Sequence, residues 1–177
     1  MSRRRAVAWI VIVTLAVCAA SALTTETVFR ADSDSMSPTI EVGDVLVAAR
    51  HRGGGPGRGD VVVFTDPGGW GERVAGLLGR EDTPSTFVKR VIGLPGERVA
   101  CCTAGGALTI NGEPLSEDYR EAGDELASVL AFDRTVPAGS VFVLGDARAA
   151  SIDSRYLGSV PIASLIGKLQ FVVPLGG

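Results

Sequence analysis

Residues 87–96, Phe-Val-Lys-Arg-Val-Ile-Gly-Leu-Pro-Gly, decide how the chain should fold. A run of β-branched and aromatic residues that ends in a Pro-Gly turn predicts a β-strand. Side chains alternate between the two faces of a strand, so Lys89 should share a face with Phe87 and Val91. Arg90 should point the other way. Each face of the expected strand therefore carries one cation between apolar side chains.

The lysine on this strand can be interpreted in two ways. It could lie at a sheet edge, with its stem on apolar neighbours and its ammonium in water. Alternatively, burial beside Phe87 and Val91 would lower the pKa of Lys89, so that the amine could accept a proton near neutral pH. Arg90 could not do this, because a guanidinium keeps its proton in proteins. Lys89 is thus the best candidate for a general base in a chain with only one other lysine, Lys168.

Short β-branched runs separated by glycine, proline and aspartate surround this strand and predict a compact, mainly β domain. The dipeptide at 111–112, Asn-Gly, predicts a tight hairpin turn, since both residues tolerate positive φ. Residues 116–134 are acidic and weakly patterned, which indicates a loop or insertion over the sheet. No long amphipathic helix is expected in the domain. Strands are expected near residues 45–49, 61–64, 86–92, 98–101, 108–110, 141–144 and 165–173.

The composition of the 177-residue chain argues against several classes of function. The length suits one globular unit, and a net charge of −3 without a basic stripe argues against nucleic-acid binding. The single histidine, His51, precedes a glycine-rich turn, so a Ser-His-Asp triad is not expected. One histidine and three cysteines form no spaced ligand set, and neither a metal nor a cofactor is expected. Cys101 and Cys102 are adjacent and could form a disulfide or remain two thiols.

The N-terminus predicts where the domain is located. An arginine cluster at residues 3–5 precedes residues 6–23, a mostly apolar stretch that as a helix would span roughly 27 Å, close to a bilayer's hydrocarbon thickness. The positive-inside rule keeps residues 1–5 in the cytoplasm and residues 24–177 on the outer face of the cell membrane. A cleavable signal peptide ending in the small residues 20–22 is the alternative. In both interpretations the domain is exported across the membrane.

The heptad at residues 33–39, Ser-Asp-Ser-Met-Ser-Pro-Thr, follows this segment. Ser37 before Pro38 could begin a short helical turn, with proline at the first helical position. Any Ser- and Pro-rich turn after a membrane segment would look similar. Taken alone, the heptad therefore favours a structural turn over a catalytic one.

A third polar block, residues 145–155, comes directly after the apolar run at 141–144. It could be a simple turn with a surface ion pair between Asp153 and Arg155, which would stabilise the fold little. Alternatively, the block supports a site. The Ser151 hydroxyl could hold the lysine amine in position while Asp153 and Arg155 fix the loop.

Taken in order, the three blocks resemble the type I signal peptidase family of serine proteases. The matches follow the family's order and cover most of the expected exported domain. They are S-x-S-M-x-P-T at 33–39, G-D-V at Gly43 and Gly59, K-R-V-I-G-L-P-G at 89–96, and G-D with S-x-D-S-R at 145–155.

The resemblance implies a compact all-β catalytic domain of the signal-peptidase type behind one N-terminal transmembrane helix. It implies that Ser35 is the nucleophile and Lys89 the general base, with Ser151 orienting the lysine. It also implies an oxyanion hole formed by the Ser35 backbone N–H and the Ser33 hydroxyl. Shallow pockets for small substrate side chains are implied near Met36, Ile40, Phe87 and Val88.

Two positions depart from the family pattern. Asp32 stands where the family often has proline, and Ala147 stands where it often has asparagine. Neither is expected to touch the dyad of Ser35 and Lys89.

By the same resemblance, the substrates are secretory preproteins cut after small-x-small motifs such as Ala-x-Ala. The lipid bilayer and, by proximity, the secretion translocon are the other expected partners. Two alternatives remain. The chain could be a processing peptidase dedicated to one conjugation or pilus substrate, or a non-enzymatic exported β-domain that binds an envelope partner, with Ser35 merely a turn residue.

Overall fold

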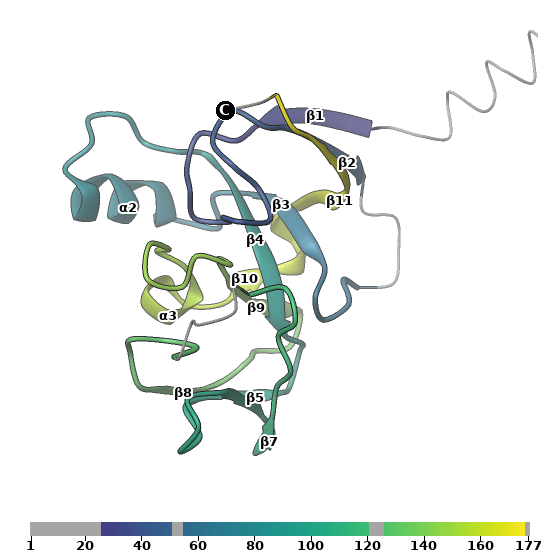
Figure 1. Ribbon diagram of the computed structural model, residues 1–177. Coiled ribbons are helices and arrows are strands. Elements are labelled where there is room, and N and C mark those ends of the chain that lie inside the picture. Colours follow the sequence, from purple (N-terminus) through teal and green to yellow (C-terminus); the bar gives the residue numbers. More distant parts are fainter. Residues whose placement is uncertain (1–25, 51–54, 121–125, 176–177) are drawn as a thin grey trace, which may run out of the picture.

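The computed structural model describes residues 26–50, 55–120 and 126–175 (Figure 1). Its centre is strand β4 (Thr86–Gly93), which pairs antiparallel with β3 (Val61–Thr65) and β9 (Ser140–Leu144). These strands belong to a seven-stranded sheet with the order β1-β2-β11-β3-β4-β9-β10. Its other members are β1 (Glu26–Arg30), β2 (Val45–Arg50), β10 (Val160–Pro161) and β11 (Leu165–Val173).

A second, four-stranded sheet lies at one end of the domain, at the bottom of Figure 1, with the order β7-β6-β5-β8. Asn111 and Gly112 join two of its strands in a two-residue turn, with φ values of 53° and 92°. The predicted hairpin is therefore confirmed. The strands of this sheet are β5 (Arg98–Cys101), β6 (Leu108–Ile110), β7 (Glu113–Pro114) and β8 (Phe132–Thr135).

The described residues also contain three short helical segments: α2 (Trp70–Leu78), α3 (Ser154–Leu157) and the 3₁₀ turn η1 (Ile162–Ser164). The sequence pattern predicted none of them. Helix α2 covers only nine residues between Gly69 and Gly79, too short for a clear helical period. It is nevertheless held in place, because Trp70 and Val74 pack into the core.

Aromatic side chains fix the core beside α2. Phe64, Trp70 and Phe87 contact one another with ring centroids 5.5–5.6 Å apart. Edge-to-face and stacked ring pairs contribute about 0.5–1.5 kcal/mol each beyond the area they bury. A second core beneath the small sheet contains the stacked pair Phe132 and Phe142. The two cores hold β4 and β9 from opposite faces.

The seven expected strands are confirmed, and the mainly β fold class with them. Strands β1, β7, β8 and β10 were not predicted, and β8 begins inside the segment 116–134 that was expected to be a loop. The expected transmembrane segment, 6–23, lies outside the described residues. Within the described ranges, no helix is both long and apolar enough to cross a membrane.

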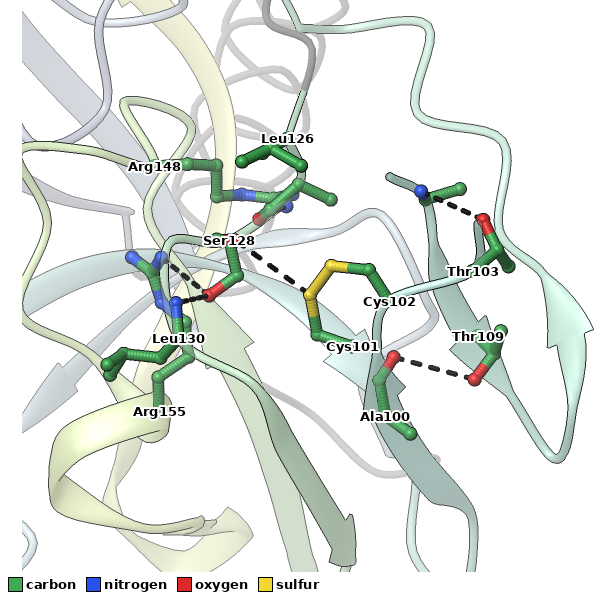
Figure 2. The surroundings of a disulfide bond; sticks show 12 residues. Ala100, Cys101, Cys102, Thr103, Thr109, Leu126, Ser128, Leu130, Arg148 and Arg155 are labelled. Atoms are coloured by element: carbon green, nitrogen blue, oxygen red, sulfur yellow. Dashed lines mark hydrogen bonds between the residues drawn. A yellow bond between two sulfur atoms is a disulfide. The ribbon is translucent and has the colours of Figure 1, made fainter. Parts of the chain in front are cut away.

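Cys101 and Cys102 form a disulfide between neighbours at the end of β5 (Figure 2). The Cys101 sulfur lies 3.9 Å from the carbonyl oxygen of Ser128. The Ser128 hydroxyl in turn accepts hydrogen bonds from the Leu130 N–H and, at 3.4 Å, from Arg155. The disulfide therefore sits against the loop that leads into β8, on the far side of that loop from Arg155.

Candidate active site

The heptad and β4 bring Ser35 and Lys89 together from positions 54 residues apart. The Lys89 Nζ atom donates a hydrogen bond of 2.7 Å to the Ser35 Oγ atom. Both residues are buried, with exposed fractions of 4% for Lys89 and 8% for Ser35. As the alternation predicted, Lys89 shares its face with Phe87 and Val91, which belong to the aromatic core. It is not a snorkelling residue at a sheet edge.

Burial lowers the pKa of Lys89 to about 8. The cause is desolvation of the ammonium, and the carboxylates of Asp153, Asp146 and Asp32 oppose it by favouring the charged form. None of these carboxylates forms an ion pair with the amine in the described part of the chain. A substantial share of the lysine is thus neutral at pH 8. Such an amine can take the proton of the hydroxyl that it contacts.

The heptad forms a compact turn, but no helix begins at Pro38, and the Ser37 hydroxyl donates to the Glu41 carboxylate at 2.7 Å instead of capping a helix. The Ser37 N–H donates to the Asp34 carbonyl at 2.9 Å, and the Ile40 N–H donates to the Met36 carbonyl at 3.0 Å. Met36 and Ile40 are both buried in the core cluster that also contains Leu46. The structural and the catalytic interpretations are therefore compatible, because the turn is what presents Ser35.

Two hydrogen-bond donors, the Ser33 hydroxyl and the Ser35 backbone N–H, lie beside the Ser35 Oγ atom. The Ser33 Oγ atom lies 3.2 Å from the Ser35 Oγ atom, and Ser33 is exposed and lines the cleft. Among the described residues, the Ser35 backbone N–H has no hydrogen-bond acceptor. The Ser35 carbonyl is held from behind by the Ala147 N–H at 3.2 Å. The second departure from the family pattern, Ala147, thus holds the Ser35 backbone through its own backbone N–H.

The block at 145–155 is a buried support, not a surface turn. Arg155 donates to both oxygens of the Asp153 carboxylate at 2.8 Å, and both side chains are fully buried. The Ser151 hydroxyl also donates to Asp153 at 2.8 Å. In the described ranges, the Lys89 amine bonds only to Ser35, so the lysine-orienting role of Ser151 stays a prediction.

Gly145 explains how closely this block approaches the serine. A Cβ atom on Gly145 would lie 2.3 Å from the Ser151 Oγ atom and 2.3 Å from the Ser35 carbonyl oxygen. Both distances are shorter than side chains tolerate, so only glycine fits. The block and the heptad therefore pack backbone against backbone at this point.

A buried ion pair that the sequence did not predict ties the three blocks together. Arg90 donates to the two oxygens of Asp146 at 2.8 and 2.6 Å, and the Thr39 hydroxyl donates to the same carboxylate at 2.6 Å. The Arg90 guanidinium also lies 4.0 Å from the centre of the Tyr119 ring. The alternation placed Arg90 on the face opposite Lys89, and Gly-Asp at 145–146 was noted as a motif. The sequence did not predict that Arg90 contacts Asp146.

The segment 116–134 also reaches this network. Glu117 forms a buried ion pair with Arg148 and accepts a hydrogen bond of 2.6 Å from the Tyr119 hydroxyl. Arg148 also donates a hydrogen bond of 2.9 Å to the Gly145 carbonyl. Part of the acidic segment is therefore packed against the third block.

A cleft of about 210 Å³ opens beside the dyad. All four residues predicted for the substrate pockets line it: Met36, Ile40, Phe87 and Val88. The opposite wall is formed by α2 and the residues that follow it, and the sequence could not predict this wall because it did not predict the helix. Further lining residues are Phe29, Asp32, Val74, Leu78, Arg80 and Pro84.

Comparisons with known proteins find relatives of one family. The family model for signal peptidase, peptidase S26, matches residues 3–174. Signal peptidase I of Leptolyngbya laminosa is 39% identical over 141 residues, which cover 77% of this chain and 63% of that protein. Signal peptidase I of Bacillus caldolyticus is 33% identical over 153 residues, 79% of this chain and 75% of that one. The chain thus spans just under two thirds of the cyanobacterial relative.

A solved structure is also similar. The crystal structure of a signal peptidase I from Enterococcus faecalis V583 aligns with a TM-score of 0.50 and 36% sequence identity. The alignment covers 65% of this chain and 97% of that one.

Proposed function

The chain belongs to the signal peptidase family, peptidase S26, and from this membership we propose that it is a serine endopeptidase that removes signal peptides from secreted preproteins. The observation that carries the proposal is the buried 2.7 Å contact between Lys89 Nζ and Ser35 Oγ. A turn residue in a binding module would need neither a buried lysine nor a lowered lysine pKa.

The reaction begins with neutral Lys89 as the general base. Its amine takes the Ser35 proton as the Oγ atom attacks the scissile carbonyl, and a tetrahedral oxyanion forms. The resulting ammonium then returns the proton to the leaving amine, which departs as the new N-terminus. An ester between Ser35 and the signal peptide remains. Water, deprotonated by Lys89, attacks this ester and restores the free serine.

The oxyanion of the tetrahedral intermediate is stabilised by the Ser35 N–H and the Ser33 hydroxyl. The lack of another acceptor for that N–H in the described chain and the 3.2 Å separation of the two Oγ atoms support these roles. Preset donors of this kind typically contribute a factor of about 10²–10³ each. Ser33 should therefore matter without being essential.

Ser151, Asp153 and Arg155 position the base. The Asp153–Arg155 pair fixes the loop, and Ser151 stands between this pair and the backbone of the serine turn. The Asp153 carboxylate acts on Lys89 through its charge. Without this support, the Lys89 amine could move away from Ser35.

The substrates are preproteins with small residues before the scissile bond. Met36, Ile40, Phe87 and Val88 give the cleft a shallow apolar floor beside the dyad. Such a floor favours alanine-sized side chains, as in Ala-x-Ala, since larger ones would displace buried core residues.

The topology follows the sequence interpretation. Residues 1–5 are cytoplasmic, 6–23 form a single transmembrane anchor and 24–177 form the catalytic domain on the extracytoplasmic face. The bilayer confines the enzyme beside membrane-bound signal peptides and close to the translocon. That confinement raises the effective concentration of the substrate.

Cleavage of a membrane-inserted Ala-x-Ala preprotein tests the proposal. The full-length wild type should release the mature protein, and Ser35→Ala should not, while retaining its fold by circular dichroism. A serine-directed acylating probe should label the wild type at Ser35. A chain that neither cleaves nor is labelled would be a binding module instead.

A further inference from the structure

One acidic side chain in the substrate cleft is not used by the mechanism. Asp32 lines the cleft next to Ser33, one residue before the oxyanion donor, and is exposed to solvent. Its charge acts on both Lys89 and Arg80, which line the same cleft. The family often has an uncharged proline at this position, so Asp32 gives this cleft a charge of its own.

Asp32 has no partner within the described residues. No hydrogen bond or ion pair of its carboxylate occurs there, in contrast to the nearby Asp82. Asp82 accepts from Arg80 at 3.0 and 2.5 Å through two separate guanidinium nitrogens. An unpaired carboxylate on the wall of a cleft can bind a cation that enters with the substrate.

The other charged groups of the cleft do not neutralise this carboxylate. Lys89 is buried and bonded to Ser35, and Arg80 is already paired with Asp82. Arg30 also lines the cleft, but its Nη2 atom lies 3.8 Å from where a Cβ atom on Gly43 would stand. The Arg30 guanidinium thus reaches toward the neighbouring turn.

We propose that Asp32 is a specificity residue, which selects preproteins that carry a Lys or Arg side chain close to the scissile bond. The inference rests on the proposed function. It adds a charge preference to the small-residue rule, because a basic side chain that reaches the Ser33 side of the cleft can pair with the free carboxylate. An acidic side chain at the same place is repelled.

The preference should be modest, since Asp32 is exposed. Ion pairs of exposed side chains change an equilibrium by a factor of up to about five. The ratio of kcat/KM between a lysine and a glutamate substrate should therefore be about fivefold, and it should decline as salt screens the pair.

The experiment uses one Ala-x-Ala preprotein in which single residues flanking the cleavage site are changed in turn to Lys, Gln or Glu. The full-length wild type should prefer Lys over Glu at one or two of these positions. Asp32→Asn should remove the preference, and Asp32→Lys should invert it. Asp34→Asn is the matched control, because Asp34 is acidic, exposed and two residues away but does not line the cleft. It should keep the wild-type preference.

Ratios within one enzyme variant separate specificity from effects on the dyad, since a change in Lys89 alters all substrates alike. Equal cleavage of Lys, Gln and Glu substrates by the wild type would overturn the inference, as would a preference that survives in Asp32→Lys. Either result leaves the proposed function intact. A wild type that cuts none of the substrates, the neutral one included, would instead overturn the proposed function.

Discussion

The two faces of β4 shift the pKa values of two neighbouring cations, Lys89 and Arg90, in opposite directions. Lys89 is buried against the Ser35 hydroxyl, no carboxylate of the described residues pairs with its amine, and its pKa is lowered to about 8. Arg90 is also buried, which alone would lower its pKa, but the two-bond pair with Asp146 outweighs burial and the pKa is raised. A buried amine without a direct counterion has a lowered pKa and can act as a base. A buried guanidinium that is paired with a carboxylate stays charged and links two parts of the fold. Lys89 and Arg90, which show these two behaviours, are adjacent residues of β4.

Substitution of the base should have the largest effect. Lys89→Ala should lower kcat/KM by about 10⁴-fold, the upper range for loss of a general base. Lys89→Arg should be equally inactive, because the guanidinium keeps its charge. Preprotein cleavage measures both. Substantial activity in Lys89→Arg would show that this face of β4 supplies only a positive charge.

Loss of the cation on the other face should affect stability instead. Arg90→Ala leaves the buried Asp146 carboxylate without its partner, which should cost about 3–5 kcal/mol in the free energy of unfolding. Arg98→Ala is the control, because its pair with Asp133 is 63% and 52% exposed and should contribute far less to the free energy of unfolding. Denaturant unfolding in detergent measures both. Equal costs for the two variants would mean that the Arg90–Asp146 pair is not a cross-link.

The oxyanion side of the cleft should show an intermediate effect. Ser33→Ala should lower kcat by about 10²–10³-fold with little change in KM, since the hydroxyl acts on charge that develops in the transition state. Ser33→Thr retains the hydroxyl and should recover most of the rate. If kcat of Ser33→Ala equals that of the wild type, the Ser33 hydroxyl is no oxyanion donor.

The smallest effect concerns the charge around Lys89. Asp32 favours the ammonium form of the lysine, so Asp32→Asn should move the acid limb of the kcat/KM profile to lower pH. Because Asp32 is exposed, the shift should be less than about one pH unit. Asp34→Asn should leave the limb where it is. An upward shift in Asp32→Asn would contradict the sign of this interaction.

The placement of Lys89 and Arg90 on opposite faces could be predicted from the sequence. The partner of Arg90 could not. Period-two alternation put the two cations on opposite faces, and the absence of a suitable histidine pointed to Lys89. Local pattern could not show that Arg90 meets Asp146, because that contact joins residues 56 positions apart and depends on strand order.

The cleft wall was predicted least well. Helix α2 has a helical run of nine residues between two glycines and is fixed by the burial of Trp70 and Val74, which is a tertiary effect. Without the helix, the wall opposite the dyad could not be foreseen. The role of Asp32 was missed for a related reason. Asp32 was expected not to touch the dyad, and it makes no bond to it in the described structure, but its charge favours the ammonium form of Lys89.

The central claim is that a buried, neutral Lys89 is the base, and the pH dependence of kcat/KM tests it most directly. The pKa of Lys89 lies near 8, so activity should rise with pH along a single acid limb centred at about pH 8. His51→Ala should leave this limb unchanged. An acid limb near pH 6.5 that disappears in His51→Ala would contradict the account.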